Sequence, residues 1–218
     1  MVITGRNTQR LQQTFDELDG EGHLQMVADL TDQEQINALS QWCIQLDGVV
    51  HSAGIAKLVL LPFFKKRDVE EIFSANTFAP IILTSRLVKQ KKISRGGSIV
   101  FISASSGVHI SSVGESLYSA TKGAIHGFVK GIALDLSPKQ IRVNSIVPGL
   151  VPTDILNVAG DLFSVEEVLE RRKSQYPLGR FGKPEDIAMG AIFLLSDAST
   201  WVTGSAMKID GGLTLGAI

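Results

Sequence analysis

The sequence has little of what several classes of protein require. Its 218 residues include one cysteine, Cys43, which excludes an internal disulfide framework and a cysteine-cluster metal site. It has no apolar run of membrane-spanning length, and Arg6 and Arg10 interrupt the first residues in a way that a signal peptide does not. The 21 lysines and arginines nearly balance the 22 aspartates and glutamates, so no global field attracts nucleic acid or anionic lipid. We therefore expect a cytoplasmic protein that binds neither nucleic acid nor membrane.

The remaining composition is that of an ordinary globular domain. Hydrophobic residues make up 44% of the chain and charged residues 20%, which supplies enough apolar surface to offset the entropy of folding. The four histidines show no metal-ligand spacing, so we expect no metal site. Because we find no internal repeat, linker or composition break, we expect a single domain over residues 1–218.

Short apolar segments alternate with amphipathic ones along the chain. The pattern predicts strands at 2–5, 24–28, 48–52, 98–103, 141–147 and 206–210, and helices at 7–18, 31–46, 68–91, 116–136 and 184–195. Thr31 is the expected cap of the second helix, with Glu34 three residues later. This alternation is typical of an α/β fold, a Rossmann-like doubly wound parallel sheet in three α/β/α layers. In such a sheet ligands bind beyond the carboxyl ends of the strands.

Tyr118 and Lys122 form a Tyr-x-x-x-Lys pair on one face of the predicted 116–136 helix. A neighbouring ammonium favours the phenolate and lowers the pKa of the phenol, which suits general acid–base chemistry near neutral pH. Taken alone the pair is weak, because chance supplies one in about nine sequences of this composition.

Other motifs stand in order around this pair. The apolar segment 99–102 leads into Ser103-Ala104-Ser105-Ser106-Gly107, and the later motifs are Arg142–Gly149, Gly182–Asp186 and Asp210–Gly212. Together they resemble the classical short-chain dehydrogenase/reductase family over nearly the whole chain, and most closely its β-ketoacyl-carrier-protein reductases. The resemblance implies an NAD(P)(H)-dependent oxidoreductase that transfers hydride between nicotinamide and a small carbonyl or alcohol substrate.

The resemblance also implies roles for individual residues. Tyr118 matches the proton donor or acceptor, and Lys122 the lysine that lowers the tyrosine pKa and holds the nicotinamide ribose. Asn76 matches the asparagine that positions a proton-relay water, with local hydrogen bonding as its alternative. The family's usual sequence spacing, counted back from Tyr118, makes Ser105 the serine that orients the substrate carbonyl. A gapless alignment through Gly107 instead places Ala104 there, and Ser103 is the other candidate.

Several residues match the family's cofactor site. Ala53 and Gly54 match the two residues whose backbone approaches the cofactor closely in this family, and Ser52 stands in place of the usual asparagine before them. Asp29 matches an acidic residue beside the adenine, and its alternative role is to cap a helix entry. The segment that closes over the nicotinamide corresponds to Pro148, Gly149 and Thr153, and residues 150–177 resemble the variable substrate lid.

Arg6 bears on the choice of cofactor. NAD-using relatives tend to have an acidic residue at the end of this strand, where the present chain has Gly5 followed by Arg6. A guanidinium fits the 2′-phosphate of NADP, so we expect NADP, with NAD possible and a solvated surface arginine as the alternative.

The sequence contains no Gly-x-x-x-Gly-x-Gly phosphate-binding turn. We therefore expect a domain without the family's first βα unit, and three explanations stay open: an upstream start, a natural truncated relative, or replacement by a rearranged or partner segment. The second would make the chain a non-catalytic interaction or regulatory subunit. In similar proteins the helix that corresponds to 116–136 joins a four-helix interface, which implies a homodimer or homotetramer.

Overall fold

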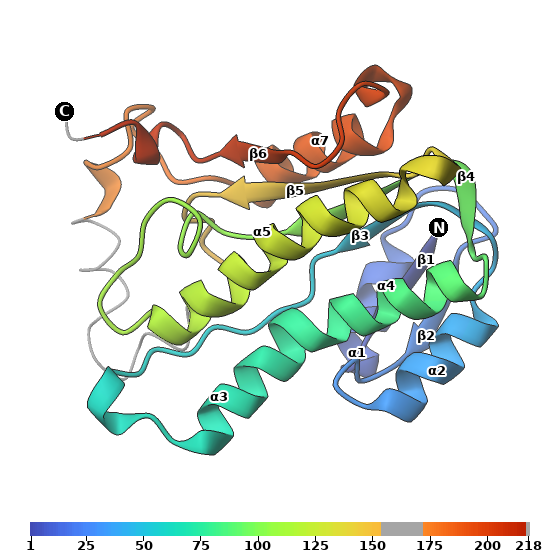
Figure 1. The fold of residues 1–218 in the computed structure, drawn as a ribbon, viewed down its shortest axis with the longest axis horizontal. Coiled ribbons are helices and arrows are strands. Elements are labelled where there is room, and N and C mark those ends of the chain that lie inside the picture. The colour runs from blue at the N-terminus through green and yellow to red at the C-terminus, as the bar shows by residue number, and fades with distance from the viewer. Residues whose placement is uncertain (154–171, 217–218) are drawn as a thin grey trace.

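A computed structural model describes residues 1–153 and 172–216, and its elements alternate as the sequence predicts (Figure 1). They are β1 (Val2–Gly5), α1 (Thr8–Asp16), β2 (Leu24–Val27), α2 (Gln33–Trp42), β3 (Leu46–His51), α3 (Lys66–Phe73), α4 (Ala79–Lys89), β4 (Ile93–Ile102), α5 (Ser116–Leu136), β5 (Arg142–Pro148), α7 (Pro184–Leu195) and β6 (Ala206–Ile209). Helices α5 and α7 have the predicted bounds.

The strands form two parallel sheets, whereas the sequence predicts one. Strand β1 pairs only with β2, and the second sheet has the order β3-β4-β5-β6. Every ladder is parallel, which confirms the expected α/β class. The division arises because β1 and β3 are not hydrogen-bonded to one another, so each has a single strand neighbour within residues 1–153 and 172–216.

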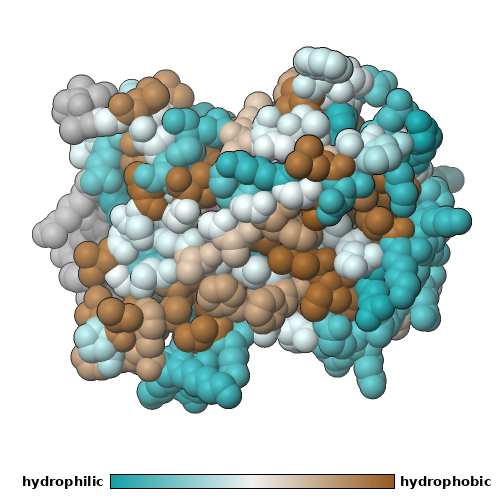
Figure 2. Space-filling view, in the orientation of Figure 1, coloured by the Kyte–Doolittle hydropathy of each residue, from teal (hydrophilic) through white to brown (hydrophobic). Residues whose placement is uncertain are grey.

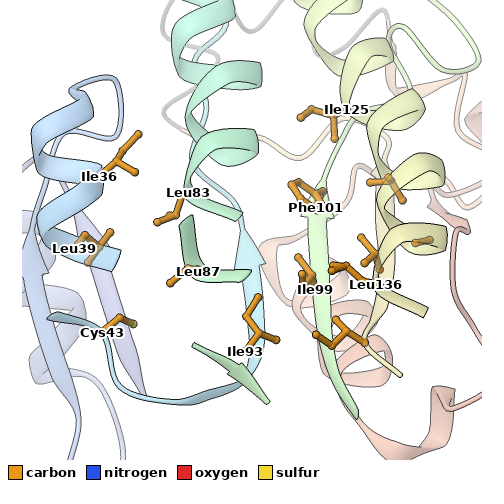
Figure 3. Close-up of a cluster of buried hydrophobic side chains, with 14 of the residues drawn as sticks. Ile36, Leu39, Cys43, Leu83, Leu87, Ile93, Ile99, Phe101, Ile125 and Leu136 are labelled. Atoms are coloured by element: carbon orange, nitrogen blue, oxygen red, sulfur yellow. The ribbon is translucent and has the colours of Figure 1, made fainter. Parts of the chain in front are cut away.

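One hydrophobic cluster joins the two sheets. Leu39 and Cys43, at the end of α2, belong to the same buried cluster as Leu83 of α4 and Ile99 and Phe101 of β4 (Figure 3). Burial raises the pKa of the Cys43 thiol, as expected for a cysteine in this cluster.

Alternate residues of β4 face opposite layers of helices. Ile99 and Phe101 pack in the cluster that includes Ile125 of α5, whereas Val100 packs with Ile146 of β5 and Leu194 of α7. This period of two places α5 and α7 on opposite faces of the sheet. The predicted three-layer arrangement is therefore present around β4 and β5.

Two predicted helix boundaries were wrong. Asp32 caps α2, because its side chain accepts hydrogen bonds from the backbone N–H groups of Glu34 and Gln35; Thr31 instead donates its backbone N–H and its hydroxyl to Asp29. The helix ends at Trp42, and Leu46 already belongs to β3.

The predicted helix at 68–91 contains a π-helical turn, Ser74–Phe78, between α3 and α4. Such a turn inserts a residue into the helical ladder and often marks a functional position. It carries the buried side chain of Asn76. No helix in the described part of the chain is long and apolar enough to cross a membrane.

The last residue of β3, His51, gives the fold a sensitivity to acid. Its ring is buried, hydrogen-bonded through Nε2 to Thr84 Oγ1 at 2.8 Å and stacked on Phe101 with centroids 4.6 Å apart. Burial lowers the pKa of His51 from its ordinary value of 6.5 to about 4. Between pH 4 and pH 6.5 the unfolded chain binds a proton on this imidazole that the folded chain does not bind. The contribution of neutral His51 to stability is therefore fully present above pH 6.5 and is lost as the pH falls toward 4.

We expect the free energy of unfolding to fall by about 3 kcal/mol because of this histidine as the pH is lowered from 6.5 to 4. In urea denaturation across that range, His51→Gln should lose the corresponding part of the pH dependence, because glutamine does not titrate. His109→Gln, the same change at an exposed position, is the control. Equal pH dependence in His51→Gln and the unaltered protein would contradict the assignment.

Candidate active site

Tyr118 and Lys122 lie on one side of α5, as the spacing predicts. The Lys122 side chain is buried, and its Nζ donates a hydrogen bond to the carbonyl oxygen of Ile102, at the end of β4, at 2.9 Å. The same Nζ lies 5.7 Å from the centroid of the Tyr118 ring. The pair therefore sits at the carboxyl end of the central strand, where a doubly wound sheet binds its ligand.

The pKa values of this pair differ from the expectation. Burial raises the pKa of Tyr118 to about 12, with a further contribution from the Glu115 carboxylate, and burial lowers that of Lys122 to about 8. The predicted lowering of the phenol pKa by Lys122 is thus absent here. The reason is geometric: the ammonium lies over the ring and donates to a main-chain carbonyl, so the loss of water around the phenol dominates.

The structure distinguishes the serine candidates after β4. Ser103 Oγ donates to the Lys122 carbonyl oxygen at 3.2 Å, and Ser106 Oγ donates to Glu115 Oε2 at 2.7 Å. The Ser105 side chain is buried and its backbone N–H donates to Pro148 O, yet its hydroxyl has no partner within residues 1–153 and 172–216. Of these three serines, Ser105 is the one whose hydroxyl makes no hydrogen bond within the described residues, and its role toward a substrate stays a prediction.

Gly107 explains how this serine loop reaches α5. Its φ is +87°, and a Cβ at this position would lie 2.0 Å from the carbonyl oxygen of Ser119. Only glycine permits both the left-handed backbone and the close approach. The contact holds residues 103–107 against the helix turn that follows Tyr118.

The Asn76 amide ties the loop after β3 to α5. Its Oδ1 accepts from Ile55 N at 2.8 Å, and its Nδ2 donates to Ile55 O at 2.8 Å and to Thr121 Oγ1 at 3.1 Å. The predicted alternative of local hydrogen bonding is wrong, because Ile55 and Thr121 lie 21 and 45 residues from Asn76 in the sequence, and the role in positioning a water stays a prediction. The π-helical turn aims the side chain into the core, where it fixes the loop that contains Ala53 and Gly54.

This loop fits the nicotinamide end of a dinucleotide. A Cβ on Gly54 would lie 3.1 Å from Asn76 Oδ1 and 3.6 Å from Lys122 Nζ, and residues 52–54 are exposed. Lys122 Nζ uses one of its three N–H groups on Ile102, which leaves donors for ribose hydroxyls. The residues present therefore suit the nicotinamide riboside.

Arg6 and Asp29 follow neighbouring strands at the same edge of the small sheet. Gly5 pairs with Val27, and Arg6 is exposed directly after β1. Asp29 Oδ1 accepts from the backbone N–H and hydroxyl of Thr31; these bonds hold its pKa below the usual range, and Arg6 adds to the effect. Asp29 thus shapes the turn before α2, but Asp32 caps that helix, so the alternative role of Asp29 as a helix cap is wrong and its place beside the adenine stays a prediction.

The segment after β5 begins beside Ser105. Pro148 O accepts from Ser105 N, and Gly149 N donates to Ile209 O at 3.0 Å. Thr153 is exposed at the end of the first described range. Most of the predicted substrate lid, residues 154–171, lies outside the described residues.

Comparisons with known proteins agree with this geometry. A family model described as enoyl-(acyl carrier protein) reductase matches residues 1–214. Carbonyl reductase family member 4 of Danio rerio is 32% identical over 219 residues, covering 99% of this chain and 87% of that protein. The 3-oxoacyl-(acyl-carrier-protein) reductase of Thermotoga maritima is 34% identical over 193 residues, covering 87% and 76%. The chain belongs to the short-chain dehydrogenase/reductase family.

Solved structures support the same assignment. A short-chain dehydrogenase family protein of Francisella tularensis superposes with a TM-score of 0.86 at 29% identity, covering 99% of this chain and 88% of the other. A gluconate 5-dehydrogenase of Burkholderia cenocepacia, solved with NADP and tartrate, gives 0.86 at 26% identity, covering 99% and 86%. This short-chain dehydrogenase/reductase is therefore an NAD(P)-dependent oxidoreductase that transfers hydride between nicotinamide and a carbonyl or alcohol. The alternative of a non-catalytic subunit is not favoured.

Sequence reasoning about this reductase missed three side chains near the site. Glu115 bonds to the serine loop, Lys57 forms ion pairs with Asp68 at 2.7 Å and Glu71 at 2.8 Å, and Tyr176 Oη accepts from Leu150 N at 2.8 Å. Only Glu115 carried a usable signal, because it stands three residues before Tyr118, at the N-cap of α5. No cluster of three metal-ligating side chains occurs in the described part of the chain.

Proposed function

We propose that the chain is an NADP(H)-dependent reductase of a small carbonyl substrate, with Tyr118 as its proton donor. The observation that supports this most directly is the position of buried Lys122, whose Nζ lies 5.7 Å from the centroid of the Tyr118 ring and would lie 3.6 Å from a Cβ on Gly54. Ser105 stands on the loop that Gly107 holds against the turn after Tyr118. These groups supply the three functions that carbonyl reduction requires from the protein: a proton, a cation near the cofactor and a donor to the carbonyl oxygen.

The proposed chemistry divides between cofactor and protein. When bound, the reduced nicotinamide supplies the hydride, that is, a proton together with two electrons. Ser105 donates a hydrogen bond to the carbonyl oxygen and holds the carbonyl in place. As the carbonyl carbon accepts the hydride, its C=O π bond breaks and the oxygen takes the phenolic proton of Tyr118. Tyr118 is left as a phenolate that solvent reprotonates, and Lys122 holds the ribose through its unused N–H groups.

The most informative first substrate is a 3-oxoacyl thioester, because several relatives carry that activity in their names. Oxidation of NADPH that depends on this substrate, followed by its absorbance, tests the proposal. A further panel of small ketones and polyol-derived ketones covers the carbonyl reductase and gluconate dehydrogenase relatives. No turnover with any of them, in a chain that binds NADPH, would reject the reductase assignment.

Arg6 is expected to select NADPH over NADH. Removing a guanidinium that bonds to the 2′-phosphate should weaken NADPH binding by about 10- to 100-fold and leave NADH binding nearly unchanged. Calorimetric titration of Arg6→Ala with both cofactors measures this selectivity, and Arg10→Ala, on the exposed side of α1, is the control. Equal losses for NADPH and NADH would contradict the role of Arg6.

We further propose a cytoplasmic homodimer or homotetramer that forms through α4 and α5. Figure 2 shows apolar residues along the face that these helices present, with hydrophilic residues at its margins. Phe78, at the start of α4, is 51% exposed, and Leu134 of α5 is 76% exposed. Continuous apolar surface of this kind is typical of subunit interfaces.

A further inference from the structure

Thr121 stands between Tyr118 and Lys122 on α5 and is fully buried. Its Oγ1 donates a hydrogen bond to the carbonyl oxygen of Tyr118 at 2.7 Å and accepts one from Asn76 Nδ2 at 3.1 Å. The direction of both bonds is fixed, because a carbonyl oxygen can only accept and an amide N–H can only donate. One hydroxyl therefore connects the Asn76 amide with the main chain of the residue that carries the phenol.

A second hydrogen bond joins the same two segments. Thr77 Oγ1 donates to the carbonyl oxygen of Thr121 at 3.3 Å, and both residues are buried. Asn76 and Thr77 are neighbours in the π-helical turn Ser74–Phe78. A π-helix has more residues per turn than an α-helix, so successive side chains lie at a smaller angle and can face the same neighbour. The turn thus places two donors against one residue of α5.

The Asn76 amide continues this connection to the loop after β3. Its Oδ1 accepts from Ile55 N and its Nδ2 donates to Ile55 O, both at 2.8 Å. The two acceptors of its NH₂ group are thus Ile55 O and Thr121 Oγ1. A Cβ on Gly54 would lie 3.1 Å from Asn76 Oδ1 and 3.6 Å from Lys122 Nζ. The loop therefore approaches both the amide and the ammonium.

We propose that Thr121 is a positioning residue, whose hydroxyl fixes the helix turn of Tyr118 and Lys122 against the loop that suits the nicotinamide riboside. Thr121 acts through these two residues, since its own side chain is buried and its hydroxyl is bonded on both sides. The inference rests on the proposed function, because this placement matters for proton transfer only if Tyr118 donates the proton.

The end of β4 holds the same helix turn from another direction. Ser103 Oγ donates to the carbonyl oxygen of Lys122 at 3.2 Å, and Lys122 Nζ donates to Ile102 O at 2.9 Å. These bonds fix the turn relative to the sheet, whereas Thr121 fixes it relative to the loop after β3. Because a misplacement of about 1 Å can cost on the order of 100-fold in rate, loss of this hydroxyl should slow the chemical step.

Replacement of Thr121 by valine and by serine tests the proposal. Valine keeps the branched shape and removes the hydroxyl, which leaves one buried N–H of Asn76 without its acceptor. With the carbonyl substrate that the unaltered protein reduces fastest, we expect Thr121→Val to lower kcat by about 10- to 100-fold. KM and the Kd of NADPH should change by less than about threefold, because Thr121 contacts neither ligand. Thr121→Ser keeps the hydroxyl and should keep kcat within about threefold of the unaltered value.

Ser98→Ala is the matched control. Ser98 Oγ is buried and donates to a helix carbonyl, Leu194 O, at 2.7 Å, on the side of β4 that faces α7. The variant loses a comparable buried hydrogen bond and should keep its kcat. Equal losses of kcat in Thr121→Val and Ser98→Ala, or in Thr121→Val and Thr121→Ser, would overturn the proposal. If Thr121→Val does not fold, Thr77→Val decides: a three- to tenfold lower kcat, of about the size expected for one hydrogen bond, supports the proposal, and an unchanged kcat overturns it.

Amide hydrogen exchange gives a measurement that does not depend on activity. The backbone N–H of Ile55 is bonded to Asn76 Oδ1, so its exchange rate reports the loop end of the connection. Nuclear magnetic resonance should show faster exchange at Ile55 in Thr121→Val and a normal rate in Thr121→Ser and Ser98→Ala. Unchanged exchange in Thr121→Val would overturn the inference whatever its kcat.

The two measurements separate this inference from the proposed function. If Tyr118→Phe lowers kcat and Thr121→Val does not, the inference fails and the proposed function stands. If neither variant lowers kcat while exchange at Ile55 still becomes faster, the connection through Thr121 stands and the proposed role of Tyr118 fails.

Discussion

Replacing Tyr118 by phenylalanine is expected to reduce kcat for carbonyl reduction by about 10²- to 10⁴-fold, the usual contribution of a general acid. The change removes one oxygen from a half-buried ring and leaves its packing in place. Cofactor affinity should be little altered, because Lys122 donates to Ile102 and needs no phenol to hold its position. Steady-state rates with NADPH and a 3-oxoacyl thioester, together with calorimetric cofactor titration, measure the two effects.

The split between turnover and binding is what identifies a proton donor. A variant that lost NADPH affinity and turnover together would indicate a binding role for the phenol instead. A variant that kept the full rate would require another acid and would reject Tyr118 as the proton donor. Urea denaturation of both proteins shows whether any loss of rate comes from a loss of folded protein.

The second large effect is expected at Gly107. In Gly107→Ala the new Cβ would meet the Ser119 carbonyl oxygen 2.0 Å away, and the backbone would keep a φ of +87°. Overpacking and the left-handed conformation together should lower the free energy of unfolding by about 3–5 kcal/mol. Any relaxation would move Ser105 away from Tyr118, and a displacement of about 1 Å costs on the order of 100-fold in kcat.

Gly96→Ala separates the two contributions. Gly96 also has a positive φ, +81°, but a Cβ there meets nothing within 4 Å. It should cost about 1–2 kcal/mol and leave kcat unchanged. If both alanine variants have the same stability and the same rate, the contact between Gly107 and α5 does not position the serine loop.

The sequence predicts most of the fold because its signals are local. The period of apolar residues, together with a proline just after α5 and a proline at the start of α7, suffices to predict both helices with their observed bounds. The Tyr-x-x-x-Lys pair follows from helix geometry alone, since residues four apart share a face.

What the sequence could not show depends on contacts between distant segments. The π-helical turn at Ser74–Phe78 has no periodic signature in the sequence. It contains Asn76, whose side chain is hydrogen-bonded to Ile55, 21 residues earlier. The sequence also could not show that the hydroxyl of Ser103 is already bonded to the carbonyl oxygen of Lys122, which only three-dimensional contacts reveal. The raised pKa of Tyr118 likewise reflects burial by residues far away in the chain.

The unpaired side of β3 has a consequence for the protein in concentrated solution. A strand edge displays a row of N–H and C=O groups that can accept a strand from another molecule. Val50 in this strand is 40% exposed, and within the described residues only β4 pairs with β3. Within the described residues this edge therefore presents its backbone groups to one further strand, and a charged residue at Val50 would act as a gatekeeper against pairing with a strand of another molecule.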